Sequence, residues 1–225
     1  MKKQLIISIG TGRCGSVSLS KFLSAQESIN VLHEGRLDSH NIRRLIKWED
    51  DEIKLFKWLN FLLELDNQNT YIGDTGMYFL PYIEKIIDKY PEVKIIVMER
   101  DKNEVVKSYL KKTSGRNHWF KHNGQKWDLD NKWDPCYPKY EIKDKEKALE
   151  KYWEEYKKQT DILIKKYPDN IRKWTTKSLN TDEGKNQILD YLNFKYERKI
   201  KQEFRHNTKL KSQKESIINK IKKWF

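Results

Sequence analysis

The feature that most constrains the fold is a glycine-rich loop near the start of the chain, set between an apolar segment and an amphipathic one. Residues 4–9, Gln-Leu-Ile-Ile-Ser-Ile, form a short apolar run typical of a buried strand. Glycines at positions 10, 12 and 15 then mark a loop. Residues 16–26 carry apolar side chains on one side, which predicts a helix. The chain therefore opens with a strand, a glycine loop and a helix.

The rest of the sequence continues this alternation of short apolar runs and amphipathic segments. Strands are predicted at 29–33, 71–73, 93–98 and 171–175, and helices at 50–66, 79–90, 103–112, 144–166 and 181–193. Strands that alternate with helices predict a three-layer α/β fold, in which a parallel sheet has helices on both faces. Ligands of such sheets bind outside the carboxyl ends of the strands. The two loops that directly follow strands, 10–18 and 99–108, are therefore the expected site.

The length and the charge of the chain restrict its class and its partners. With 225 residues, 37% of them hydrophobic, the chain has room for a single domain with its own core. The net charge of +13 favours an anionic partner: nucleic acid, anionic lipid, an acidic glycan, or a phosphorylated or sulfated cofactor. Residues 195–225 hold 11 Lys or Arg against 3 Glu, so much of the excess lies in the tail.

This basic tail, residues 196–225, is predicted to form short helices. It has no helix-turn-helix, zinc or RNA-recognition signature, so we expect no specific nucleic-acid partner. A solvated charged face is the simpler interpretation. Its apolar residues leave peripheral membrane contact as an alternative, on the side carrying Ile217, Ile218, Ile221, Trp224 and Phe225.

The number of cysteines and the first residues of the chain indicate the cellular compartment to expect. The two cysteines, Cys14 and Cys136, support neither a disulfide framework nor a cysteine-based zinc site. The apolar run at 5–7 is too short for a signal peptide, and no stretch is long enough to span a bilayer. We therefore expect a cytoplasmic protein.

The first loop has the Gly-x4-Gly spacing of a phosphate-binding loop, from Gly10 to Gly15. Glycines let backbone N–H groups approach a phosphate, and the following helix adds partial positive charge. The Lys and Ser/Thr that bind ATP phosphates and Mg²⁺ are missing, because Ser16 and Val17 occupy their places. ATP or GTP hydrolysis is therefore disfavoured, although Arg13 is placed to pair with a phosphate or sulfate. The alternative is a tight strand–helix turn with no ligand.

The second loop follows the strand predicted at 93–98. Arg100 stands at the end of that strand, and Ser108 lies eight residues further on, inside the next helix. A loop that folds back would bring both side chains to one anion. Taken alone, a surface arginine and a helical serine would be the simpler interpretation.

Together the two loops resemble the cofactor site of sulfotransferases that use 3′-phosphoadenosine 5′-phosphosulfate (PAPS), in particular the bacterial and viral members. Residues 11–16, Thr-Gly-Arg-Cys-Gly-Ser, resemble the 5′-phosphosulfate loop of that family, and Arg100 with Ser108 resembles its 3′-phosphate motif. Residues 71–74 and 174–194 are similar to further parts of these enzymes. The resemblance covers roughly residues 4–195.

The resemblance implies a P-loop-like α/β fold and transfer of a sulfuryl group to a hydroxyl or amine, without a metal and with adenosine 3′,5′-bisphosphate as product. It implies that Ser16 and Val17 bind the 5′-phosphosulfate through backbone N–H groups. The cofactor-binding residues implied are Gly12, Arg13, Cys14, Gly15, Ser16, Val17, Arg100 and Ser108. An Arg-Lys-Gly motif that many cytosolic members carry near the C-terminus is absent, and the basic stretch 205–209 is only a conceivable substitute.

Catalysis needs charge stabilisation, for which Arg13 is the candidate, and a base for the acceptor proton. His33 and Glu34 follow the second predicted strand, where family members place a His or a Glu, and we favour Glu34. The alternative is that His33 caps a strand and Glu34 is solvated. Asp74 is a weaker candidate, and a Cys14 nucleophile is disfavoured because no histidine is near it in sequence.

Residues 113–140 show little periodicity and are predicted to form a lid or acceptor loop. His118 and His122 have the spacing of a metal pair, but no third ligand is evident. Together with Trp119 they are the candidates for the lid of the acceptor pocket. For most of Trp127, Trp133 and Tyr137 we expect packing, with stacking on a sugar as the alternative.

The sequence therefore favours a PAPS-dependent sulfotransferase with a small-molecule, glycan or lipid acceptor. Two alternatives remain, a P-loop kinase and a catalytically silent polyanion-binding protein. The segments expected to select the acceptor, 34–70 and 113–140, carry no motif that names it.

Overall fold

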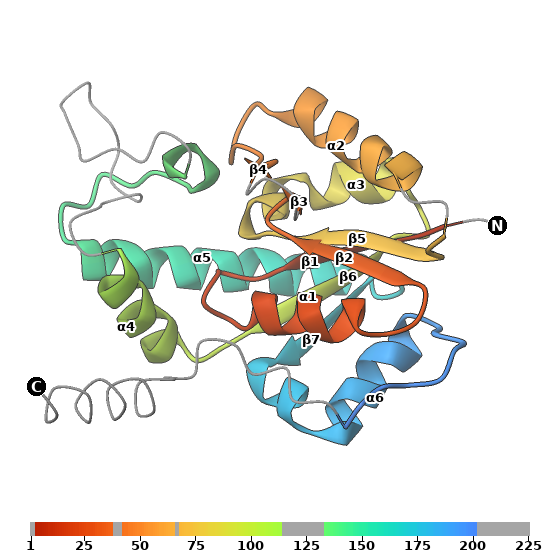
Figure 1. Ribbon diagram of the computed structural model, residues 1–225. Helices are drawn as coiled ribbons and strands as arrows, with labels where there is room; N and C mark the ends of the chain where they lie inside the picture. Colours follow the sequence, from red (N-terminus) through yellow and green to blue (C-terminus); the bar gives the residue numbers. More distant parts are fainter. Residues whose placement is uncertain (1–2, 38–41, 66–67, 114–132, 202–225) are drawn as a thin grey trace, which may run out of the picture.

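The computed structural model describes residues 3–37, 42–65, 68–113 and 133–201 (Figure 1). Its centre is a sheet of five strands in the order β2-β5-β1-β6-β7, in which every neighbouring pair is parallel. The strands are β1 (Gln4–Ile9), β2 (Ile29–His33), β5 (Tyr71–Thr75), β6 (Lys94–Glu99) and β7 (Ile171–Thr175). A separate antiparallel pair consists of β3 (Arg36–Leu37) and β4 (Ile42–Arg43).

Helices connect these strands and cover the sheet. The α-helices are α1 (Ser16–Ser24), α2 (Glu52–Leu65), α3 (Ile83–Lys89), α4 (Lys102–Lys112), α5 (Lys145–Lys166) and α6 (Asp182–Tyr191). The described residues also form three short 3-10 helices, η1 (Met77–Tyr82), η2 (Asp134–Cys136) and η3 (Thr176–Asn180).

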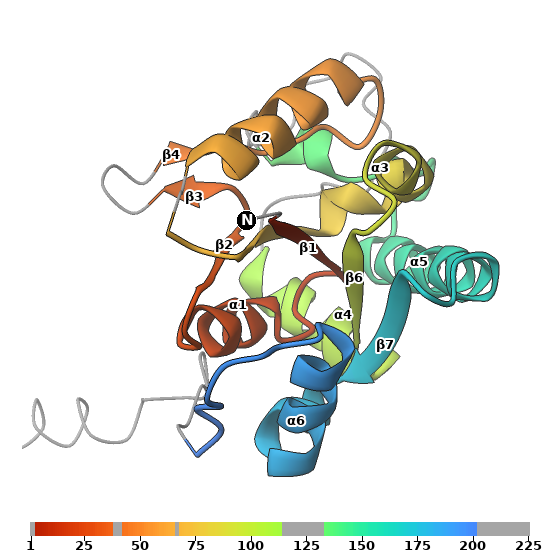
Figure 2. The same cartoon turned by 90° about the vertical axis from the view of Figure 1, so that its right-hand side faces the viewer.

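Alternation along β1 divides the core into two layers. Leu5, Ile7 and Ile9 pack with residues of α2, α3, α4 and α5, whereas Ile6 packs with residues of α1 and α6. Successive side chains of a strand point to opposite faces, so one apolar strand feeds both cores. Figure 2 shows α1 and α6 on one side of the sheet and α2, α3 and α5 on the other. This arrangement confirms the predicted three-layer α/β fold.

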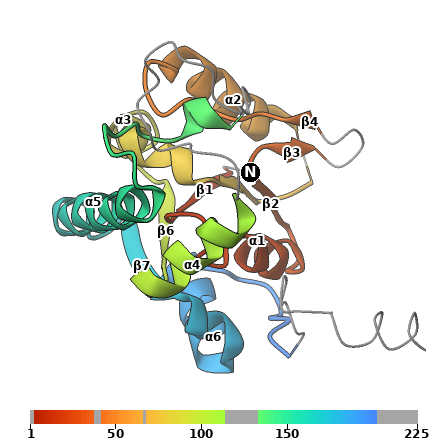
Figure 3. The ribbon, with the colours of Figure 1, turned by 90° about the vertical axis from the view of Figure 1, so that its left-hand side faces the viewer.

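The order of the strands places the expected site between β1 and β6. After β1 the chain crosses to β2 at one edge of the sheet, and after β6 it crosses to β7 at the other edge. The connections that leave these two adjacent strands therefore run to opposite edges of the sheet, and ligands of such sheets bind at the carboxyl ends of the strands where this happens. Figure 3 shows α4 in front of the sheet at this end, close to the start of α1.

The structure differs from the sequence prediction in a few places. The helix predicted at 79–90 begins as the 3-10 helix η1 at residue 77, and regular α-helix starts only at residue 83. Pro81 lies inside η1, where its missing N–H is tolerated more readily than in the interior of an α-helix. The β3–β4 pair was not predicted, because strands of two residues leave no alternating pattern.

Several predicted features lie outside the described residues. Most of the predicted lid falls there, including His118, Trp119, His122 and Trp127. The same holds for the basic tail from residue 202, with the stretch 205–209.

Candidate active site

The glycine loop leaves β1 and turns into α1 through three residues with positive φ. These are Gly12 at 76°, Arg13 at 57° and Gly15 at 92°. Glycine adopts this region freely, whereas Arg13 does so at a cost of about 1 kcal/mol or more. Gly15 is the N-cap of α1 and makes no side-chain capping bond. The first backbone bond of the helix joins Leu19 N–H to the Gly15 carbonyl, at 2.9 Å. The preceding N–H groups, which the helix does not use, give its start an attraction for anions.

Cys14 contributes to this loop through its backbone and its packing. Its side chain is fully buried, and burial raises the pKa of the thiol to about 11, although backbone N–H groups of Gly12, Cys14 and Ser16 act in the opposite direction. The thiol is therefore protonated at neutral pH, which argues against the nucleophile interpretation. The Cys14 carbonyl accepts a bond from the Thr176 hydroxyl at 2.9 Å.

The two predicted loops meet at Arg13. Its Nε donates to the Ser108 hydroxyl at 2.9 Å, and Arg100 Nη1 donates to the Arg13 carbonyl at 3.0 Å. Arg100 also forms an ion pair with Glu104, whose Oε2 lies 2.7 Å from Nε. The structure thus brings Arg13, Arg100 and Ser108 together. It adds Glu104, which the sequence analysis did not single out.

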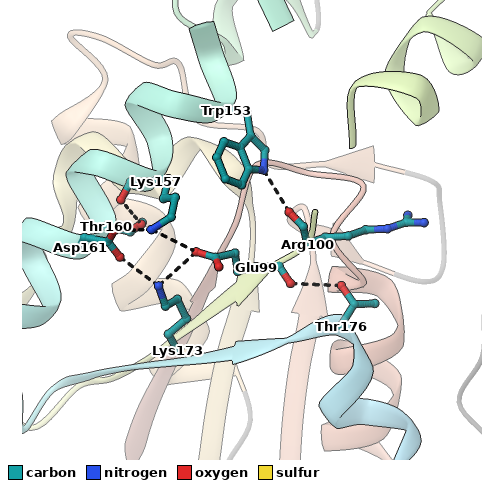
Figure 4. A network of polar contacts seen from close by, with 8 residues as sticks. All are labelled: Glu99, Arg100, Trp153, Lys157, Thr160, Asp161, Lys173 and Thr176. Carbon is teal, nitrogen blue, oxygen red and sulfur yellow. Dashed lines mark hydrogen bonds and ion pairs between the residues drawn. The ribbon is translucent and has the colours of Figure 1, made fainter. Parts of the chain in front are cut away.

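A polar network holds the end of β6, from which Arg100 projects (Figure 4). The Trp153 indole N–H donates to the Arg100 carbonyl at 3.0 Å. The Thr176 hydroxyl lies 3.3 Å from the Glu99 carbonyl and 2.9 Å from the Cys14 carbonyl, so it bridges both loops. The Glu99 carboxylate pairs with Lys173 at 3.1 Å. Sequence analysis missed these residues, which come from α5, β7 and η3 and have no local motif.

Three tyrosine hydroxyls also contact the backbone of the glycine loop. Tyr109 of α4 and Tyr152 of α5 both donate to the carbonyl of Thr11, at 2.7 and 3.0 Å. Tyr156 of α5 accepts from Gly10 N–H at 2.9 Å. Gly10 and Thr11, the first two residues of the glycine loop, are therefore fixed by side chains that lie about 100 or more positions further along the chain.

His33 and Glu34, at the carboxyl end of β2, lie beside the start of α1. His33 Nε2 and the Ser16 hydroxyl are hydrogen-bonded at 3.0 Å, and His33 Nδ1 lies 3.4 Å from Glu34 Oε2. The two side chains are 18% and 20% exposed, which leaves them within reach of a bound molecule. Glu34 has a φ of 53°, and its N–H donates to the Thr75 carbonyl at 2.7 Å. The predicted base candidates are thus joined to Ser16, a predicted cofactor residue.

Asp74 lies within β5 and is fully buried. Its carboxylate accepts bonds from Gly35 N–H at 3.0 Å, Thr75 N–H at 2.8 Å and the Trp58 indole N–H at 3.0 Å. Burial raises the pKa of Asp74 to about 7, against the effect of these bonds. Its contacts indicate that Asp74 fixes the turn that follows Glu34.

Glu34 also acts electrostatically on the segment 133–140. The negative charge of Glu34 contributes to the raised pKa values of Cys136 and Tyr137, although burial is the main cause in both cases. Trp48 N–H donates to the Pro135 carbonyl at 2.7 Å, which ties this segment to the chain that follows β4. The Tyr137 ring packs edge-on against Tyr152, with ring centroids 6.1 Å apart. For Tyr137 the packing interpretation therefore holds.

The described residues show neither a cluster of metal-ligating side chains nor a helix that could span a membrane. Within ranges 3–37, 42–65, 68–113 and 133–201, no three His, Cys, Asp or Glu residues cluster as a metal site would require. In the same part of the chain, none of the helices has the length and apolar character needed to cross a bilayer.

Comparison with known proteins shows the fold and the family of this chain. A search of curated proteins gave no match. Among solved structures, the chain is similar to a sulfotransferase from Alicyclobacillus acidocaldarius, with a TM-score of 0.52 and 14% sequence identity over 90% of this chain and 87% of the other. This likeness shows the fold. A family model described as "Sulfotransferase domain" matches residues 5–193, and the chain therefore belongs to the sulfotransferase family.

Proposed function

We propose that this chain transfers a sulfuryl group from PAPS to a hydroxyl or amine of a small-molecule, glycan or lipid acceptor, with residues 1–225 acting as one domain. The observation that carries the proposal is the convergence of Arg13, Arg100 and Ser108 where the loops after β1 and β6 meet. Two guanidinium groups, a hydroxyl and a helix N-terminus fit a donor with two separate anionic groups.

The donor side of the proposed site consists of residues 10–17, Arg100 and Ser108. Arg13 and the N–H groups at the start of α1 would hold the 5′-phosphosulfate, including those of Ser16 and Val17. Arg100 and Ser108 would hold the 3′-phosphate. PAPS supplies the activated sulfuryl group when bound. Arg13 is the side chain best placed to stabilise the charge that develops on the transferring group.

On the acceptor side we assign the base to Glu34. His33 Nε2 is hydrogen-bonded to Ser16, so of the two candidates, His33 and Glu34, we assign the His33 ring to the donor side. The Glu34 carboxylate acts electrostatically on Cys136 and Tyr137, in the segment that we assign to the acceptor side, and also on Tyr109 of α4. Glu34 would therefore accept the proton that the acceptor hydroxyl or amine loses, while His33 orients its carboxylate.

Ligand-dependent thermal unfolding tests the donor. Adenosine 3′,5′-bisphosphate, AMP, and ATP with Mg²⁺ are compared in parallel on the full chain. A ligand at about 100 times its Kd stabilises the native state by roughly 2.7 kcal/mol. This raises Tm by several degrees for a domain of this size. We expect the largest shift with the bisphosphate. A shift with ATP and Mg²⁺ alone would instead support a kinase, and no shift with any of them would contradict a nucleotide donor.

A further inference from the structure

We propose that Tyr109 and Tyr152 are positioning residues, whose hydroxyls hold the Thr11 carbonyl so that the glycine loop is set for anion binding before the donor arrives. The inference rests on the proposed function for the identity of the donor. It concerns residues of α4 and α5 that carry no recognisable motif.

The contacts that carry the inference are buried and converge on one atom. The Tyr109 and Tyr152 hydroxyls both donate to the Thr11 carbonyl oxygen, at 2.7 and 3.0 Å. A carbonyl oxygen has two lone pairs, so both are engaged. Burial raises the pKa of each tyrosine well above its ordinary value, so both hydroxyls keep the proton that they donate.

Peptide planarity turns this contact into control of the loop. In a planar trans peptide the carbonyl of Thr11 and the N–H of Gly12 point in opposite directions. With the carbonyl drawn towards α4 and α5, the Gly12 N–H turns away from these helices and lies on the side of the buried Cys14 sulfur. A flipped peptide would leave the Thr11 carbonyl without its two donors and would alter the path of the chain into Arg13 and the start of α1, where we propose that the anion binds.

The loop that these contacts hold is strained. Arg13 has a φ of 57°, a conformation that is unfavourable for a residue other than glycine. Hydrogen bonds from two tyrosine hydroxyls to the preceding Thr11 carbonyl help to offset this strain.

The fit between Tyr109 and the loop is close. A Cβ atom at Gly12 would lie 2.1 Å from the Tyr109 hydroxyl oxygen, so no side chain fits there while the hydroxyl is present. The residue before Tyr109 is Ser108, which contacts Arg13. Helix α4 thus presents two adjacent residues to the same loop. Tyr137 is hydrogen-bonded to Tyr109 and extends this chain of hydroxyls to the acceptor side.

Tyrosine-to-phenylalanine variants test the proposal with little change in volume. The variants are Tyr109→Phe, Tyr152→Phe and the double variant. The control is Tyr140→Phe, because the Tyr140 ring is also buried but its hydroxyl bonds Glu155 at 2.7 Å and does not contact the loop. Calorimetric Kd values for adenosine 3′,5′-bisphosphate and Tm values are measured for each.

We expect each single variant to weaken binding about 3- to 10-fold, and the double variant about 10- to 100-fold because the Thr11 carbonyl then lacks both donors. Tyr140→Phe should lower Tm without changing Kd. A double variant that binds the bisphosphate as tightly as Tyr140→Phe would overturn the proposal. If the double variant does not fold, the single variants decide the question against the same control.

Hydrogen exchange separates this inference from the proposed function. Amides of residues 12–16 are followed in the ligand-free protein, and we expect faster exchange in the double variant, or in the singles, than in Tyr140→Phe. Equal exchange overturns the positioning role whatever the ligand is. A wild-type protein that does not bind the bisphosphate contradicts the proposed donor, while the exchange result still decides the role of the two tyrosines.

Discussion

The donor side and the acceptor side that we propose for the site are built in different ways. Donor residues stand directly after β1 and β6, or in the helices that follow, and the parallel sheet brings these points together. On the acceptor side, His33 ends the strand β2 and Glu34 follows it directly. Its other described parts, the chain after β4 and residues 133–140, meet through the bond from Trp48 to Pro135. The sheet therefore dictates the donor site, whereas the acceptor site depends on segments that the sheet does not position.

The largest effect is expected at the junction of the two sides. Glu34→Gln keeps the shape of the side chain but removes the basic carboxylate, so turnover should fall about 100- to 10,000-fold with unchanged affinity for adenosine 3′,5′-bisphosphate. The measurement is bisphosphate release from PAPS, with an acceptor found by screening hydroxyl and amine compounds. Full activity in Glu34→Gln, together with its loss in His33→Asn, would move the base to His33.

On the donor side, Arg13→Ala should lower kcat about 100- to 1,000-fold, because it removes the charge that faces the transferring group. The new residue accepts a positive φ no worse than arginine does, so the fold should survive, as circular dichroism would show. The matched control is Arg172→Ala, which removes an exposed arginine that packs on the Tyr191 ring, outside the site. Equal rates in the two variants would remove Arg13 from the chemistry.

Asp74, which fixes the turn after Glu34, makes the free energy of unfolding depend on pH. Burial raises the folded-state pKa of Asp74 from 3.8 to about 7, so the folded protein binds this proton more tightly than the unfolded chain does. The stabilisation is complete below about pH 4 and is lost as pH rises through 7. Between pH 5 and 8 this group should lower the free energy of unfolding by up to about 3 kcal/mol. Urea unfolding should show this loss in the wild type and not in Asp74→Asn; identical pH profiles would contradict it.

A smaller effect is expected from the ion pair that engages Arg100. Its partner, Glu104, is 59% exposed, so the pair contributes at most about 1 kcal/mol. Glu104→Gln frees Arg100 and removes a negative charge, so affinity for adenosine 3′,5′-bisphosphate should rise about 2- to 5-fold at low salt. The control is Glu154→Gln, which breaks the pair with Lys102. Weaker binding in Glu104→Gln alone would show that the pair helps to hold the ligand.

Much of the fold could be predicted because its signals are local. Apolar runs such as 4–9 and 93–98 gave the strands of the sheet, and the glycines of loop 10–15 marked its turn into α1. The limits of this approach are visible at Asp74. The predicted strand ends before it, but the residue lies inside β5 because it pairs with Ile7 of β1 and Leu32 of β2. Gly35 and Trp58, both distant in sequence, donate to its carboxylate.

The candidate site was predictable only in part, for the same reason. Arg13, Arg100 and Ser108 form two short patterns whose contact follows from the order of the strands. Thr176 and Tyr152 are ordinary residues of η3 and α5 by any local criterion. Only the packing of α5 and of the segment after β7 on the end of the sheet brings their hydroxyls to the glycine loop.

The most direct test of the account is whether Arg100 recognises the 3′-phosphate. Calorimetry compares adenosine 3′,5′-bisphosphate with AMP on the wild type and on Arg100→Ala. A charge-assisted contact contributes about 1.5–3 kcal/mol, so the wild type should prefer the bisphosphate about 10- to 100-fold. The account predicts that Arg100→Ala loses most of this preference and binds AMP as the wild type does. An undiminished preference in Arg100→Ala would contradict the donor site described here.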